Sequence, residues 1–155
     1  MRNFLLVVLI VGGLALLCGW WLNKSEAAQA APLDAEGLDY AKVPDGTPEQ
    51  IVEYEGFRVS FNKENKTPNW VAWELLGSET EGMEPRYNNF WQDERVEGCP
   101  VTYDYSYSGY DRGHMCPAAD QKWSHQAMVD CFSLVNMAPQ DHSLNSGAWS
   151  TLENK

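Results

Sequence analysis

The segment "SGYDRGHMCPAAD" (residues 108–120) holds the side chains with the clearest chemical potential in the chain. Asp111, Arg112 and His114 fall within four positions, and His114 is one of only three histidines. Histidine can accept a proton near neutral pH, and arginine binds phosphate oxygens through two donors at once. Taken alone, the tetrapeptide fits a structural turn at least as well, with Gly113 permitting a tight backbone path.

A second polar run lies downstream, in "NMAPQDHSLNSGAWSTLE" (residues 136–153). It carries Asn136, Asn145 and Glu153 where a core segment would be apolar. Asn145 and Glu153 are eight residues apart, which is about two helical turns, so they project toward similar sides of one helix. One amide oxygen and a carboxylate acting through water are enough to place Mg²⁺, because this ion keeps most of its waters.

These two runs together suit the hydrolysis of a phosphodiester bond. The reaction needs a base that activates water, a cation that stabilises charge on the phosphate, and a proton for the leaving oxygen. His114 suits the first task and a metal held at Asn145 suits the other two. We expect a strand-turn element bearing His114 to pack against a helix bearing Asn145, with the phosphate between them.

Composition limits how such a protein binds its substrate. The chain has 155 residues, enough for one domain with a real core, and 44% of them are apolar. The formal net charge is −11, which excludes a broad basic face of the kind that drives nucleic-acid binding through counterion release. Phosphate chemistry here must rest on a few placed cations or a metal.

The N-terminal residues read as an export signal or anchor. Residues 4–22 carry no charge and end in Trp20 and Trp21, a length and an ending typical of a membrane-spanning helix. The sequence Ala28-Gln29-Ala30 fits a signal cleavage site. We therefore expect residues 1–30 to be a signal peptide or membrane anchor, and residues 31–50 to be a linker. The rest would lie outside the cytoplasm, in the periplasm, secreted, or anchored in the inner membrane.

The remaining chain predicts a mixture of strands and helices. Residues 54–62 alternate in a strand pattern, and residues 67–76 predict a second strand that could pair with the first as a hairpin. Residues 77–100 look irregular, and residues 123–135 predict a short helix that passes into an extended segment. Pro139 breaks regular structure after that. A final helix begins near residue 143, with Leu144, Ala148, Trp149 and Leu152 spaced to bury one side.

The motifs "SGYDRGHMCPAAD", "LVNMAPQ" and "LNSGAWSTLE" resemble those of the DNA/RNA non-specific endonuclease family, which includes endonuclease G and the Serratia-type nuclease. The likeness covers residues 51–155. The resemblance implies an α+β fold of the ββα-metal (His-Me finger) type and a metal-dependent endonuclease that cleaves DNA and RNA to 5′-phosphate ends. Residues 51–155 would be the N-terminal portion of that domain, apparently truncated within the metal-finger helix.

The resemblance also implies roles for individual residues. His114 would be the general base. Asn145 would bind Mg²⁺ directly, with Mn²⁺ as a possible substitute, and Glu153 would hold the ion through water and so take part in catalysis.

By the same resemblance, Arg86 and Arg112 would contact the substrate phosphate, and Arg112 would count among the catalytic residues. Asn136 would support the site by hydrogen bonding, and Asp111 would orient the turn.

Two other interpretations are open at this point. The chain could be a catalytically inactive, truncated and membrane-tethered remnant of the family that only binds nucleic acid. A structural zinc module built from Cys116, His125, Cys131 and His142 is weaker, because their spacing matches no compact zinc motif. We also hypothesise a disulfide from Cys116 to Cys99 or Cys131 that braces the loop after His114.

Overall fold

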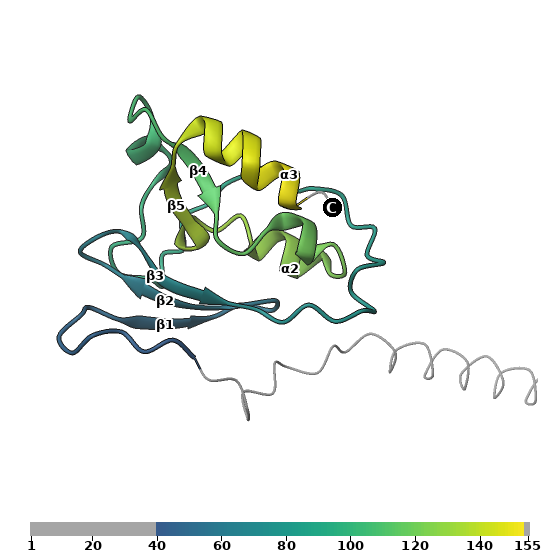
Figure 1. Ribbon diagram of the computed structural model, residues 1–155. Coiled ribbons are helices and arrows are strands. Elements are labelled where there is room, and N and C mark those ends of the chain that lie inside the picture. The colour runs from purple at the N-terminus through teal and green to yellow at the C-terminus, as the bar shows by residue number, and fades with distance from the viewer. Residues whose placement is uncertain (1–39, 154–155) are drawn as a thin grey trace, which may run out of the picture. The chain divides into compact units, whose positions relative to one another are not determined.

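A computed structural model describes residues 40–153 of the chain (Figure 1). The segment expected to form the signal or anchor and residues 31–39 of the expected linker lie outside the described residues. Within the described part, no helix is both long and apolar enough to cross a membrane. The main elements, in chain order, are β1 (Gln50–Glu53), β2 (Arg58–Asn62), β3 (Thr67–Ala72), η2 (Thr102–Tyr105), β4 (Asp111–His114), η3 (Ala118–Gln121), α2 (His125–Asp130), η4 (Leu134–Asn136), β5 (Met137–Gln140), η5 (Leu144–Trp149) and α3 (Ser150–Glu153).

The first three strands form an antiparallel sheet in the order β1-β2-β3, so the predicted hairpin of the second and third strands is confirmed. The central strand β2 is buried on both faces from Val59 to Asn62. The Asn62 side chain closes the turn that follows, because its oxygen accepts hydrogen bonds from the backbone N–H groups of Glu64 and Asn65. The strand predicted over residues 67–76 ends earlier, at Ala72.

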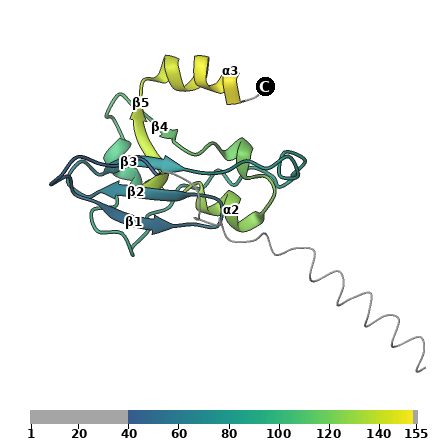
Figure 2. The same cartoon turned by 60° about the horizontal axis from the view of Figure 1, so that its bottom comes forward.

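A second, two-stranded sheet pairs β4 with β5, which are far apart in the sequence. The expected break at Pro139 is wrong, because Pro139 lies inside β5 and faces Arg112 in the register. A two-stranded ladder has free outer edges, so a residue without an N–H group fits there without loss of a hydrogen bond. The helical segment η5–α3 follows β5 and lies beyond the hairpin from the three-stranded sheet (Figures 1 and 2).

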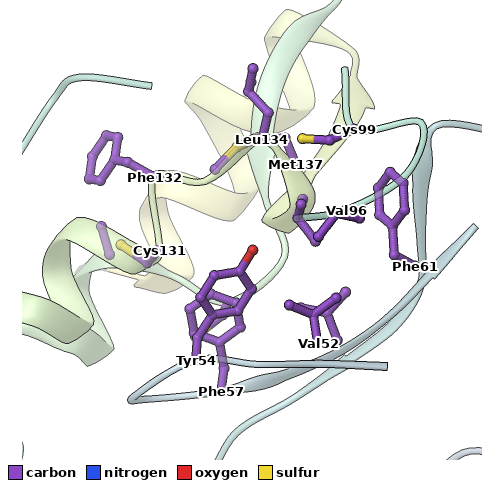
Figure 3. Close-up of a cluster of buried hydrophobic side chains, with 14 of the residues drawn as sticks. Val52, Tyr54, Phe57, Phe61, Val96, Cys99, Cys131, Phe132, Leu134 and Met137 are labelled. Carbon is purple, nitrogen blue, oxygen red and sulfur yellow. The ribbon is translucent and has the colours of Figure 1, made fainter. Parts of the chain in front are cut away.

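The core lies between the three-stranded sheet and the segment that leads from α2 to β5. All seven residues from Cys131 to Met137 are buried, and Figure 3 shows several of them facing Phe57 and Phe61 of the sheet region. The short helix predicted within residues 123–135 is therefore confirmed as α2, but the extended segment expected after it is wrong, because a turn and the 3₁₀ helix η4 follow α2. This packing fixes the base of the β4–β5 hairpin.

The helix η5–α3 differs from its prediction in two ways. Its first part, Leu144–Trp149, is a π-helix, and neither part contains a buried residue. The expected burial of one side is thus wrong for these described residues, since Leu144, Trp149 and Leu152 are 44%, 46% and 58% exposed. A π-helical turn is frequent at functional sites, where it changes which side chains share a face.

The hypothesised disulfide is also wrong, because Cys99, Cys116 and Cys131 are all free thiols in the structure. Each sulfur has a local polar partner instead. Cys116 Sγ accepts from Gln121 Nε2 at 3.2 Å, and Cys131 Sγ donates to the Met128 carbonyl at 3.2 Å. Burial raises the pKa of Cys116 well above its usual value, which suppresses the reactive thiolate.

Thiol labelling tests this arrangement. We expect Cys99, Cys116 and Cys131 to resist a thiol reagent in the folded chain, because all three are buried and protonated. Unfolding in denaturant without reductant should make all three alkylatable, as read by peptide mass spectrometry. A peptide pair that stays unlabelled until a reductant is added would contradict the assignment.

Candidate active site

The β4–β5 hairpin places His114 at the end of a strand, not in a turn. The register pairs His114 with Met137 and Gly113 with Ala138. Gly113 has an ordinary extended backbone, so the tight path expected of it is not its role. A Cβ atom at Gly113 would lie 2.0 Å from the Gln140 side chain. The glycine therefore allows Gln140 to cross the strand beside His114.

Aromatic rings surround the His114 imidazole on two sides. The ring centroid of Phe132 lies 4.8 Å away in an edge-on arrangement, and that of Phe90 lies 5.7 Å away. Backbone hydrogen bonds between Trp91 and the Phe132–Leu134 segment hold the two phenyl rings in place. His114 Nε2 is buried and has no hydrogen-bond partner among the described residues. Nδ1 is therefore the nitrogen that can act on a group in the adjoining cavity.

This setting controls the protonation of His114. Burial and, to a smaller extent, the positive charge of Arg86 together lower its pKa from the usual value of about 6.5 to about 3. The imidazole is consequently neutral throughout the physiological pH range, as a general base must be. The cost of the unpaired Nε2 is of the kind that proteins tolerate mainly at functional sites.

Asp111 links the hairpin to the helix that follows β5. Its Oδ2 accepts a hydrogen bond from Asn145 Nδ2 at 3.0 Å and lies 2.9 Å from His142 Nδ1. The hydrogen bonds from Asn145 and then from His142 lower the pKa of Asp111, so the carboxylate stays ionised. Because Asp111 occupies the amide nitrogen, the amide oxygen is the atom that Asn145 can offer to a cation.

Glu153 approaches the same region from the other end of the helix. Partial burial raises the pKa of its carboxyl group, with Arg86 acting in the opposite direction and Asp120 adding to the rise. The π-helical segment lies between Asn145 and Glu153, so their spacing along the helix is not that of an ideal α-helix. Both side chains nevertheless line one cavity.

Two arginines bring positive charge to this cavity, and each lies over a ring beside His114. The guanidinium carbon of Arg112 lies 4.2 Å from the ring centroid of Phe90. The guanidinium carbon of Arg86 lies 5.0 Å from the ring centroid of Phe132. A planar guanidinium held on an aromatic face keeps its N–H donors at its edge, where they can meet phosphate oxygens.

The structure thus gathers most of the predicted residues around one cavity of about 570 Å³. Those that line it are Arg86, Asp111, Arg112, His114, Asn145 and Glu153. Sequence reasoning missed other residues of the wall, namely Phe90, Tyr105 and Tyr110. It also missed His142 as a partner of Asp111 and Phe132 as a neighbour of His114. Tyr105 and Tyr110 had a signal in the sequence as aromatic residues next to the motif, and Phe90 had one as a neighbour of Arg86 in "RYNNFWQD".

Asn136 does not line the cavity but supports it from behind. Its Nδ2 donates to the carbonyls of Cys116 and Cys131 at 3.0 and 2.9 Å, and its Oδ1 accepts from the Cys116 N–H at 2.9 Å. Its own carbonyl accepts from the Met115 N–H at 2.9 Å. Asn136 therefore fixes the chain on the C-terminal side of His114.

The donors at the cavity suit a hard divalent cation better than zinc. The described residues contain no group of three or more His, Cys, Asp and Glu side chains that could hold a metal, so the zinc module has no support there. His125 contacts Glu84 and His142 contacts Asp111. An amide oxygen at Asn145 and a carboxylate at Glu153, with water in the other positions, match the preferences of Mg²⁺ or Mn²⁺.

Comparison with known proteins agrees with this architecture. Two antiparallel strands followed by a helix, with His114 on the first strand and Asn145 on the helix, are the arrangement expected from the ββα-metal resemblance. The chain matches the family model for DNA/RNA non-specific endonucleases over residues 36–155. The chain belongs to this family.

Individual relatives show the extent of the similarity. The chain is 38% identical over 114 residues to the mitochondrial nuclease EXOG of Danio rerio, an alignment that covers 70% of this chain and 33% of that protein. It is 35% identical over 107 residues to human mitochondrial endonuclease G, covering 67% of this chain and 36% of that protein. The chain spans about a third of the length of these curated relatives.

A solved structure gives the same result in three dimensions. A chain in the crystal structure of the EndoG/EndoGI complex superposes with a TM-score of 0.64 at 31% identity. The match covers 68% of this chain and 46% of that one. The mixed helix and sheet fold predicted from the resemblance is therefore confirmed in its general form.

The lowered pKa of His114 predicts how stability depends on pH. Between about pH 6.5 and 3 the unfolded chain binds a proton at His114 that the folded chain does not, so stability falls as pH decreases through this range. One such proton contributes a slope of up to about 1.4 kcal/mol per pH unit. Urea unfolding of the wild type and His114→Gln from pH 7 to pH 4 should show a shallower decline in the variant. Parallel declines would contradict the buried neutral imidazole.

The three side-chain hydrogen bonds of Asn136 predict a large structural cost for its removal. Asn136→Ala leaves a buried N–H and two carbonyls without their partner, and we expect a loss of about 2–4 kcal/mol in the free energy of unfolding. Chemical denaturation measures this loss. Asn65→Ala, which removes an exposed asparagine that does not have a left-handed backbone, serves as the control and should change the free energy of unfolding by less than about 0.5 kcal/mol.

Proposed function

We propose that this chain is the catalytic part of a metal-dependent endonuclease that hydrolyses DNA and RNA without sequence preference and leaves 5′-phosphate ends. The observation that carries the proposal is the neutral His114, held between two phenyl rings on a cavity that also contains two arginines, an amide and two carboxylates. Membership in the DNA/RNA non-specific endonuclease family supports it, and so do the names of the nuclease relatives.

His114 acts as the general base. Its Nδ1 accepts a proton from the attacking water, and the pKa near 3 ensures that this nitrogen is free at neutral pH. The rings of Phe90 and Phe132 exclude solvent from the other side of the imidazole and hold its plane fixed. A fixed ring keeps the base aligned with the water that it activates.

Arg86 and Arg112 bind the phosphate and stabilise the negative charge that grows on it. Both guanidinium groups are held over rings that also contact His114, so phosphate and base have a common scaffold. Contacts to phosphate carry no sequence information, which agrees with cleavage that is independent of sequence.

Asn145 and Glu153 would hold a divalent cation, Asn145 through its amide oxygen and Glu153 through water. When bound, such an ion supplies charge stabilisation at the phosphate and assists departure of the leaving oxygen. Asp111 contributes by fixing the orientation of the Asn145 amide through the 3.0 Å hydrogen bond. Location outside the cytoplasm stays a prediction that rests on residues 1–30.

Digestion of plasmid DNA and RNA by the purified chain tests the proposal. We expect cleavage with Mg²⁺ that stops on addition of EDTA, and a loss of about 10²–10⁴-fold in rate for His114→Ala. Asn145→Ala should need more metal to reach the same rate, because the amide is the direct ligand. End-labelling of the products should detect 5′-phosphates.

His125→Ala is the matched control, since His125 is exposed, pairs with Glu84 and lies outside the cavity. It should cleave at the wild-type rate. If the folded wild-type chain binds nucleic acid but cleaves neither substrate, the inactive, binding-only alternative is correct for this chain.

A further inference from the structure

The segment that leads into β4 is rich in exposed aromatic rings. We call residues 102–110 the tyrosine loop; it comprises η2 and the turn before Asp111, beside the start of the η5 helix (Figure 1). Of its four tyrosines only Tyr105 is half-buried, whereas Tyr103, Tyr107 and Tyr110 are 75%, 103% and 56% exposed. So many exposed rings on a short segment are not explained by packing.

The tyrosine loop forms one wall of the candidate active site. Tyr105 and Tyr110 line the cavity, together with Thr102 and Ser106 of the same loop. Tyr110 lies two residues before Arg112, so its exposed ring is beside a residue that would bind the scissile phosphate, and Tyr107 is three residues further back in the chain. A nucleic acid bound in the cavity would therefore contact the residues of this loop that line it.

Internal hydrogen bonds hold the tyrosine loop in a defined shape. The Ser108 hydroxyl donates to the Tyr105 carbonyl at 2.8 Å, and the Tyr110 N–H donates to Ser108 Oγ at 3.1 Å. Tyr107 has a φ of 60° and Gly109 a φ of 83°. The left-handed conformation is unfavourable for tyrosine, and no burial of the Tyr107 ring compensates for it. The loop therefore presents this ring to solvent at a cost to stability.

The described residues offer few unpaired positive charges for binding a polyanion. Only eight described residues are Lys or Arg, and four of these, Arg58, Lys63, Lys66 and Arg95, are in ion pairs. In the cavity itself, the two arginines are offset by two carboxylates, Asp111 and Glu153. Electrostatic attraction is therefore weak for a polyanion on a chain with a net charge of −11.

We propose that the tyrosine loop is a stacking platform for unpaired nucleobases, and that it makes single-stranded nucleic acid the preferred substrate. This inference rests on the proposed function of the adjoining cavity. Tyr107 and Tyr110 bind bases next to the scissile phosphate by ring stacking, which every base permits and which needs no positive charge. Bases inside a duplex are already stacked on one another, so a duplex offers these rings no free base face.

Binding measured without turnover tests the platform separately from catalysis. Fluorescence anisotropy of the full chain in EDTA would use three labelled probes of equal length: an oligothymidylate, an abasic sugar-phosphate strand and a duplex. The oligothymidylate should bind most tightly. Tyr107→Asn, which tolerates the left-handed backbone, and Tyr110→Ala should each weaken that binding about tenfold. Neither should change binding of the abasic strand.

Three further variants sharpen the result. Tyr110→Phe keeps the ring and should bind like the wild type. Tyr40→Asn removes a tyrosine that stacks on Trp70 away from the cavity and should also leave binding unchanged. In cleavage assays, Tyr107→Asn should raise KM for single strands with little change in kcat. Circular dichroism and denaturation midpoints check that each variant is folded.

The outcomes separate this inference from the proposed function. Equal binding of oligothymidylate and abasic strand, or wild-type affinity in folded Tyr107→Asn and Tyr110→Ala, overturns the platform even if His114-dependent cleavage is present. Tyrosine-dependent binding of single strands without cleavage supports the platform and overturns the catalytic proposal instead.

Discussion

The buried side chain of Asn136 is the interaction on which the rest of the site depends. It is fully buried and bonds the backbone of Cys116 on one side and of Cys131 on the other. These contacts tie the end of β4 to the end of α2, which are otherwise separate parts of the chain. A buried amide that satisfies three backbone groups allows an irregular segment to pass through the core without unpaired polar atoms. These hydrogen bonds therefore also fix the position of His114, two residues before Cys116.

The desolvation of the His114 imidazole is the second constraint, and it links the packing of the core to the protonation state of this side chain. The same Phe132 ring that packs in the core also covers one side of His114 and supports Arg86. Packing and protonation are therefore coupled, since a change that admits water beside Phe132 would raise the pKa of His114 toward its ordinary value. An imidazole that is kept neutral by burial does not need a carboxylate partner to set its pKa.

From the sequence, the residues of the candidate site could be identified, but the contacts that bring them together could not. His114, Asn145 and Glu153 could be found because their types and order are distinctive, and the alternation around β2 follows from simple patterning. The contacts of the Phe90 and Phe132 rings with His114 could not be found, since both rings come from distant irregular segments. Pro139 was misread because its tolerance depends on having a free strand edge, which is a tertiary property. The disulfide failed for a similar reason: burial and local partners, not spacing, decide the state of Cys116.

The two halves of the site are held by different kinds of force. His114 and its rings belong to a dry, tightly packed region, whereas the helix that carries Asn145 and Glu153 has no buried residue along its described length. Polar contacts position that helix: Asp111 bonds Asn145 and His142, and Asp141 caps the start of the helix through the N–H groups of Ser143 and Leu144. Apolar packing is insensitive to salt, but these exposed contacts are weak individually and are screened. The proposed base is therefore fixed by the fold, while its distance from the proposed metal ligands depends on Asp111. In the proposed reaction, a residue with no part in proton transfer thus sets the alignment of the base and the cation.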